Sequence, residues 1–181
     1  MIILLFGRPG TGKYTIGSLV AQATGFRLIH NHAVVDLVTA LFSFGSAPFI
    51  ELRERLWLML VDAAIEAGED VILTFAPEAT VTDGFLPALA SRGGLHLIEL
   101  RCSRDALEQR ITNDSRKKFG KLQSVELYRE LDGAGVFDTP VMPEAELVID
   151  TGQMSAEEAA DIIAKRLSEI SDRATSTKRR F

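Results

Sequence analysis

Cysteine is nearly absent from this sequence: Cys102 is the only one in 181 residues. A lone cysteine excludes an internal disulfide and a multi-cysteine metal cluster, and it is typical of a reducing compartment. Long hydrophobic runs are missing too. The apolar opening, residues 1–6, has no basic residues before it and ends at Gly7, unlike a signal peptide, and no run approaches the roughly 20 residues of a membrane span. We therefore expect a cytoplasmic protein that does not bind membranes.

Positive charge is also scarce. Lys and Arg number 20 against 25 Asp and Glu, which gives a formal net charge of −5. Such a protein repels nucleic acid as a whole, which disfavours a polynucleotide kinase, and any bound anion must be met by a local basic site. With 46% hydrophobic residues the chain can bury one core. We expect a single domain over residues 1–174 and a polar tail over residues 175–181.

Short apolar runs alternate with amphipathic patterns along the chain. Most of the runs are almost continuously apolar, as in the strands of a parallel sheet covered on both faces. Between them apolar residues recur at helical spacing, and Ser155 and Glu158 form a capping box ahead of the last helix. This alternation predicts an α/β fold built from right-handed βαβ units. The predicted strands are residues 2–6, 27–30, 71–75, 95–101 and 146–150.

The segment GRPGTGKYT, residues 7–15, lies between the first predicted strand and the first helix and contains the spacing G-x-x-x-x-G-K. Glycines at this spacing let successive backbone N–H groups point at phosphate oxygens, and the following helix adds its positive dipole end. The lysine then reaches the outer phosphates of a nucleotide. The predicted phosphate-binding residues are Gly7, Arg8, Pro9, Gly10, Thr11, Gly12, Lys13, Tyr14 and Thr15.

Tyr14 departs from this pattern, in which a serine or threonine after the lysine is a ligand to Mg²⁺. The phenol oxygen lies several bonds further from the backbone, whereas a Mg²⁺ ligand must approach within about 2.1 Å. Thr15 keeps a short hydroxyl, but about 100° away around the helix, which suits an inner phosphate better. We expect phosphate binding to persist, with Mg²⁺ held mainly by oxygens of the nucleotide and by water.

The second strand ends in three polar residues, His30, Asn31 and His32, and Asp36 lies about one turn further on. Open α/β sheets bind ligands at the carboxyl ends of their strands, and strand alternation predicts that His30 and His32 share a face. In one interpretation His30, His32 or Asp36 is a general base, Asn31 helps to bind the acceptor, or the histidines form a metal pair. In the other, these residues cap a helix and fill a loop. The phosphate loop opposite favours the first.

Basic residues are concentrated in RCSRDALEQRITNDSRKKFGK, residues 101–121. A solvated helix face would account for such a run. A phosphate site, however, needs counter-charges that arrive when the reaction is shielded from water. We therefore predict a basic lid over about residues 110–125, in which Arg116 stabilises the transferring phosphoryl group and Arg110 contacts the nucleotide.

Three charged residues are further candidates for the acceptor side. Arg53 and Arg55 lie in a long predicted helix, where they either grip an anionic acceptor together or form a solvent-facing pair among acidic neighbours. The third strand ends without the acidic residue that often closes a metal site beside a phosphate loop. Glu78, three residues beyond that strand, is placed to take over this function.

Together these motifs resemble the nucleoside-monophosphate-kinase-like group of P-loop NTPases. Within it, the chain is most similar to the branch of shikimate kinases, gluconate kinases, chloramphenicol phosphotransferases and uncharacterised shikimate-kinase-like ATPases. The likeness extends from GRPGTGKYT to LVIDT at residues 147–151. It implies a three-layer α/β/α fold, a five-stranded parallel sheet in the order 2-3-1-4-5 and ATP with Mg²⁺. It also implies Arg110 beside the base, Arg116 in the lid, and Asp150 and Thr151 in a loop near the adenine.

Two segments depart from shikimate kinases. Those enzymes carry Asp-x-Asp where this chain has His30 to His32, and a run of three glycines where it has FAPE, residues 75–78. We therefore expect an ATP-binding kinase for another small-molecule acceptor, not a shikimate kinase. The alternative is a nucleotide-binding sensor or slow NTP hydrolase that binds ATP without transferring its phosphoryl group.

Overall fold

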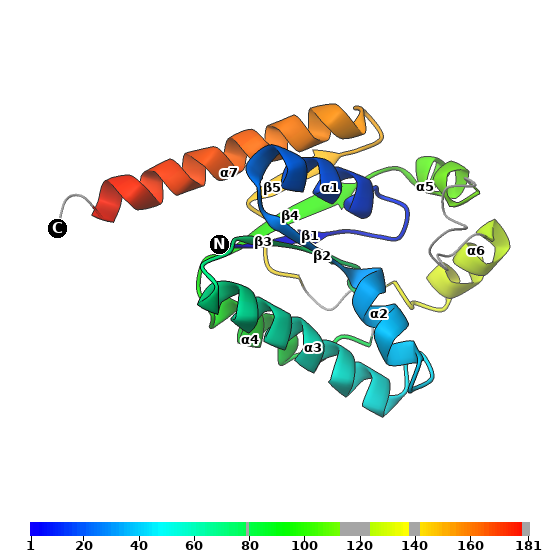
Figure 1. The fold of residues 1–181 in the computed structure, drawn as a ribbon. Helices are drawn as coiled ribbons and strands as arrows, with labels where there is room; N and C mark the ends of the chain where they lie inside the picture. The colour runs from blue at the N-terminus through cyan, green and yellow to red at the C-terminus, as the bar shows by residue number, and fades with distance from the viewer. Residues whose placement is uncertain (79, 113–123, 138–141, 179–181) are drawn as a thin grey trace.

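The computed structural model has three layers, with a parallel sheet between two layers of helices (Figure 1). It describes residues 1–78, 80–112, 124–137 and 142–178. The strands lie side by side in the order β2-β3-β1-β4-β5, and every neighbouring pair is parallel. The predicted fold class and strand order are confirmed. The strands are β1 (Ile2–Phe6), β2 (Arg27–His30), β3 (Val71–Phe75), β4 (Leu95–Arg101) and β5 (Leu147–Asp150), the last starting one residue later than predicted.

Helices cover both faces of the sheet (Figure 1). One face is covered by α1 (Lys13–Thr24) and α7 (Ala156–Lys178). The other is covered by α2 (Asn31–Thr39), α3 (Ala47–Glu66) and α4 (Phe85–Ala90). Helices α5 (Arg104–Ile111) and α6 (Val125–Gly133) lie together at one end of the molecule and share a small core of their own.

The central strand β1 explains why the apolar runs are almost continuous. Ile3 and Leu5 pack toward α1 and α7, while Leu4 and Phe6 pack toward α3 and α4, so successive side chains enter different cores. Fully burying one such side chain stabilises the fold by about 1.5–3 kcal/mol. The helix-cap prediction is confirmed as well: the Glu158 backbone N–H donates to Ser155 Oγ at 3.1 Å, and the Ser155 N–H donates to Glu158 Oε2 at 2.8 Å.

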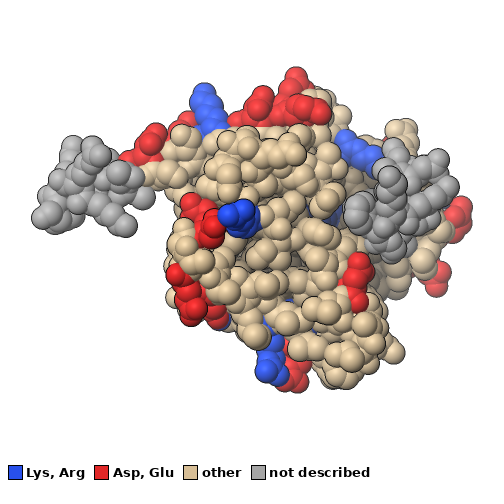
Figure 2. Space-filling model, viewed as in Figure 1, with Lys and Arg blue, Asp and Glu red and all other residues tan. Residues whose placement is uncertain are grey.

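The surface carries charges of both signs. On the face in Figure 2, basic side chains lie singly among acidic ones, and acidic side chains follow the upper edge, where α7 lies. No helix in the described part of the chain combines the length and the apolar character that crossing a bilayer requires.

Candidate active site

The phosphate loop turns from β1 into α1 along a path that requires glycine at two positions. Gly7 has φ 152°, and a Cβ there would lie only 2.2 Å from the carbonyl oxygen of Leu100. Gly12 caps α1 with φ 92°, a left-handed conformation. The buried hydroxyl of Thr11 donates to the carbonyl oxygen of Arg8 at 2.9 Å and closes the loop from inside. The loop thus leads directly into the N-terminus of a helix, where anions bind.

Lys13, the first residue of α1, folds over the loop. Its Nζ donates to the carbonyl oxygens of Gly7 at 2.6 Å and Arg8 at 2.8 Å. The guanidinium of Arg8 points elsewhere and pairs with Asp132 of α6 at 2.7 Å. Gly7 and Arg8 therefore shape and anchor the loop, whereas the ammonium group of Lys13 stands beside the cavity described next.

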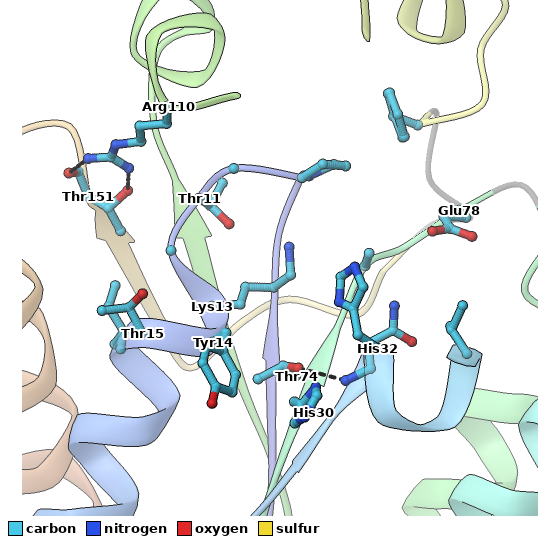
Figure 3. A pocket seen from close by; sticks show the side chains of 18 of the residues that line it. Thr11, Lys13, Tyr14, Thr15, His30, His32, Thr74, Glu78, Arg110 and Thr151 are labelled. Carbon is cyan, nitrogen blue, oxygen red and sulfur yellow. Dashed lines mark hydrogen bonds between the residues drawn. The ribbon is translucent and has the colours of Figure 1, made fainter. Parts of the chain in front are cut away.

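A cavity of about 890 Å³ opens beside this loop (Figure 3). Its walls come from the phosphate loop, from α2 and the segment after β3, from α6, and from the start of α7 with its preceding loop. It brings together most of the predicted site residues, which are far apart in the sequence. The predicted residues that line it are Pro9, Gly10, Thr11, Gly12, Lys13, Tyr14, Thr15, His30, Asn31, His32, Asp36, Glu78, Arg110 and Thr151.

The two histidines lie in different elements, so the prediction that they share a strand face is wrong. Strand β2 ends at His30, and α2 begins at Asn31, which places His32 in the first helical turn. His30 caps this helix, since its Nδ1 accepts the Ala33 backbone N–H at 3.3 Å. The Tyr14 ring meets His30 edge to face, with ring centroids 5.0 Å apart. Both histidines nevertheless line the cavity, as the first interpretation requires.

The start of α2 leaves one buried polar atom without a hydrogen bond. The Asn31 backbone N–H donates to Thr74 Oγ1 at 3.0 Å, whereas its side-chain Oδ1 is buried and has no partner in the described structure. A buried unpaired carbonyl is costly, and a ligand donor would satisfy it. Among the described residues no three His, Cys, Asp or Glu side chains are grouped to hold a metal ion.

Arg110 lies at the opposite end of the cavity. Its two terminal nitrogens donate to Thr151, to Oγ1 at 2.8 Å and to the carbonyl oxygen at 2.6 Å (Figure 3). Asp150 accepts the Gly152 N–H at 2.8 Å and thereby forms the turn after β5. It does not line the cavity among the described residues, while Arg110 and Thr151 do.

Arg53 and Arg55 point in different directions, so the prediction of a joint grip is wrong, as is that of a solvent-facing pair. Residues two apart on a helix project about 200° from each other. The Arg55 side chain is 67% exposed and pairs with Glu51 at 3.8 Å. The Arg53 side chain is 2% exposed and is not among the residues that line the cavity, but its Nη1 lies 3.6 Å from Oε2 of Glu78, which does line it.

Glu78 is the carboxylate that joins this buried arginine to the cavity. It accepts a hydrogen bond from the Thr80 hydroxyl at 3.3 Å and lines the cavity on the side facing Lys13 (Figure 3). Burial raises the pKa of the Glu78 carboxyl, and the charge of Arg53, the Thr80 hydroxyl and the charge of Lys13 partly offset this shift. A carboxyl group of this kind accepts a proton more readily than an exposed one.

Several lining residues were not predicted. Helix α6 and the turn after it supply an apolar wall, and Thr74 interrupts the apolar run of β3 at the floor. The spacing of four between two leucines of α6 is a helical signal, but it does not say which face lines a cavity. Arg116 and the centre of the predicted lid lie outside the described residues. The unpredicted apolar lining residues include Val35, Phe44, Leu127, Leu131, Val136 and Phe137.

Helices α5 and α6, on either side of segment 113–123, are joined by a charge pair. The carboxylate of Glu108 accepts two hydrogen bonds from Arg129, at 2.9 and 2.6 Å, and one from Arg104 at 3.2 Å. Hydrogen bonding to Arg129 is the main reason why the pKa of Glu108 falls from 4.5 to about 2. The link therefore holds at neutral pH.

We predict that Glu108→Gln lowers the melting temperature at pH 7 and that this difference disappears in acid. A depressed folded-state pKa stabilises the fold above the unfolded-state value of 4.5, and the contribution is lost as the pH falls through about 2. Thermal unfolding of both proteins between pH 7 and pH 2 measures this contribution to stability. Glu130→Gln, at an exposed position of α6, is the control and should show no such trend. A difference independent of pH would contradict the assignment.

The fold and the loop define a class. A five-stranded parallel sheet in the order 2-3-1-4-5, with a G-x-x-x-x-G-K loop leading from β1 into α1, is the P-loop kinase fold. No family model matches the sequence. The resemblance to the nucleoside-monophosphate-kinase-like group is confirmed at the level of the fold, because the chain is similar throughout to shikimate, gluconate and sugar kinases.

One curated relative, a shikimate kinase from Thermodesulfovibrio yellowstonii, is 26% identical over 180 residues, which cover 94% of this chain and 96% of the relative. A sugar kinase structure from Janibacter sp. HTCC2649 superposes with a TM-score of 0.65 at 18% identity, covering 92% of this chain and 94% of the other. A gluconokinase structure from Sinorhizobium meliloti 1021 gives a TM-score of 0.57 at 17% identity, covering 93% and 96%.

Proposed function

We propose that this protein is an ATP-dependent kinase that transfers a phosphoryl group to a hydroxyl of a small molecule. The observation that carries the proposal is one cavity with Lys13 of the phosphate loop on one wall and His32 and Glu78 on another (Figure 3), where Asp36 also lies. Kinases of this fold act mainly by positioning the donor and acceptor and by stabilising charge. The relatives named for kinase activity support the same reaction class.

On the donor side, the residues fit the phosphates of ATP. Backbone N–H groups of the loop and Lys13 would hold the phosphates, while Arg110 and Thr151 would lie beside the base. The fit to Mg²⁺ is poorer, because the Tyr14 ring packs against His30 where the pattern has a short hydroxyl. Oxygens of the nucleotide and water would hold the ion, which neutralises phosphate charge when bound.

On the acceptor side, the candidate residues have different proposed roles. His32 and Asp36 are proposed to receive the proton of the acceptor hydroxyl. His30 is better suited to binding, because its Nδ1 already accepts a hydrogen bond and the neutral ring then carries its proton on Nε2. Asn31 would use its unpaired Oδ1 to bind an acceptor donor. Arg116 stays the proposed lid residue for the transferring phosphoryl group.

The proposed acceptor is not shikimate, since the residues at positions 30–32 and 76–78 differ from those of shikimate kinases. The test is ADP release from ATP and Mg²⁺ in the presence of shikimate, gluconate, neutral sugars, polyols, nucleosides and hydroxylated amines. Acceleration by at least one class, with a phosphorylated product seen by mass spectrometry, supports a kinase. If shikimate is used best, the acceptor assignment is wrong. If nothing accelerates turnover although ATP raises the melting temperature, the protein is a sensor or slow hydrolase instead.

Tyr14 is the observation that favours this second function, and its substitution tests whether this residue weakens Mg²⁺ binding. We predict that Tyr14→Ser lowers the Mg²⁺ concentration needed for half-maximal stabilisation by ATP about tenfold, because serine offers a short hydroxyl ligand. The measurement is the melting temperature with ATP across a Mg²⁺ titration. Tyr14→Phe is the control, and we expect it to behave as the unsubstituted protein does. Equal shifts in both variants would mean that the ring, and not the missing short hydroxyl, controls metal binding.

A further inference from the structure

The charge of the acceptor wall indicates what kind of molecule it binds. This step rests on the proposed function, because it treats the wall formed by α2 and the segment after β3 as the acceptor site. Asp36 and Glu78 both line the cavity there. Glu78 faces it from a buried position, and Asp36 lies in the second turn of α2, beyond His32.

The one buried arginine near this wall is already neutralised. Arg53 lies 3.6 Å from Glu78 Oε2 and 4.0 Å from Glu54 Oε1, and it donates to the Thr80 carbonyl oxygen at 3.2 Å. The aromatic rings of Phe49 and Trp57 lie on it, with centroids 5.3 and 5.2 Å from the guanidinium carbon. With both carboxyl groups ionised, one guanidinium among two carboxylates leaves this cluster with a formal net charge of −1.

The other cations that line the cavity stand on the nucleotide side. Lys13 bonds the phosphate loop, and Arg110 bonds Thr151. His30 accepts a hydrogen bond through Nδ1, which requires the neutral ring. In the parts of the chain that the structure describes, His32 is therefore the only basic side chain of the acceptor wall apart from the neutral His30, while the charges of Arg53 and Lys13 reach Glu78 from outside this wall.

Apolar side chains also line this part of the cavity. Val35 and Phe44 line the cavity, and Phe44 is 55% exposed, while Leu131 and Phe137 line it from the side of α6. Large apolar side chains that remain exposed around a cavity mark surface that a ligand covers.

We infer that the acceptor is a hydroxylated molecule that is neutral or cationic and has an apolar part, and that Glu78, held by Arg53, sets this preference. A carboxylate on the acceptor would meet Asp36 and Glu78 as like charges and would have to give up its water to do so. Hydroxyl and ammonium groups donate hydrogen bonds that these carboxylates accept.

Three probes of one shape test the inference: 4-(hydroxymethyl)benzylamine, 4-(hydroxymethyl)benzamide and 4-(hydroxymethyl)benzoate. They share the ring and the hydroxyl and differ in charge. Their affinities are measured by ligand-observed NMR on the full-length protein saturated with ADP. We expect the benzylamine to bind at least about tenfold more tightly than the benzoate, with the benzamide between them.

Glu78→Gln keeps the side chain's size and removes its charge, and we expect it to reduce this preference about tenfold. Glu51→Gln, which removes an exposed carboxylate from α3, should leave it unchanged. ATP should still raise the melting temperature of both variants, which shows that the nucleotide side still binds. Equal or tighter binding of the benzoate, an unaltered preference in Glu78→Gln, or no binding of any probe at millimolar concentration overturns the inference.

The inference and the proposed function fail in different ways. Phosphoryl transfer to gluconate or another hydroxy acid, together with tighter binding of the benzoate, would retain the kinase and reject the charge preference. Preferential binding of the benzylamine that depends on Glu78, with no transfer to any acceptor class, would retain the charge preference and reject the kinase.

Discussion

Replacing Lys13 with alanine is expected to lower kcat/KM for phosphoryl transfer by a factor of about 10²–10³, because a cation that contacts the transferring group stabilises charge in a water-poor site. The ammonium group of Lys13 lines the cavity and donates to the carbonyl oxygens of Gly7 and Arg8. Its loss should therefore reduce catalysis and nucleotide binding with little effect on the fold.

Two measurements separate these effects: ADP release with the accepted substrate, and the melting temperature with and without ATP. Without nucleotide, Lys13→Ala should unfold within about 0.5 kcal/mol of the unsubstituted protein. Lys165→Ala, at an exposed position of α7, is the matched control and should retain both activity and stabilisation by ATP. If Lys13→Ala keeps its activity and its stabilisation by ATP, the loop is not a working phosphate site, and the kinase proposal should be abandoned.

The predictable part of the site is the part that depends on short stretches of sequence. The loop from Gly7 to Thr15 is contiguous, and its glycines, its lysine and the helix after it are all read from adjacent residues. The capping box at Ser155 is local in the same way. The strand order is not local, because apolar runs predict strands but not their neighbours, and it came from the resemblance to a family of known fold.

The acceptor wall was harder to predict because its geometry depends on boundaries and directions. Strand β2 ends at His30 as predicted, but α2 begins at the very next residue, so His32 lies in a helix, where alternation does not apply. The contrast between Arg53 and Arg55 depends on which face of α3 packs inward, and charge alone does not reveal that. The apolar lining from α6 could not be predicted because it depends on how α5 and α6 pack around their own core. Long-range contacts define that packing.

The buried arginine gives the second large prediction. Arg53→Leu is expected to lower the free energy of unfolding by about 3–5 kcal/mol, the cost of breaking a buried ion pair by removing one partner. Leucine would fill part of the space between Phe49 and Trp57, but Glu54 and Glu78 would lose their shared cation. Urea denaturation measures the free energy of unfolding. Arg55→Leu, at an exposed position of the same helix, is the control and should alter this free energy by no more than about 1 kcal/mol.

A double substitution shows whether Glu78 is the reason for this cost. Burial already raises the pKa of Glu78, and the charge of Arg53 is the main influence that opposes the shift, so Arg53→Leu should raise that pKa further. If the unpaired carboxylate causes the loss of stability, Glu78→Gln added to Arg53→Leu recovers part of it, and the two changes are not additive. Additive effects would mean that Arg53 acts through its packing against the rings and not through its charge. In that case Glu78 would not depend on the charge of Arg53, and its preference for cationic acceptors should survive in Arg53→Leu.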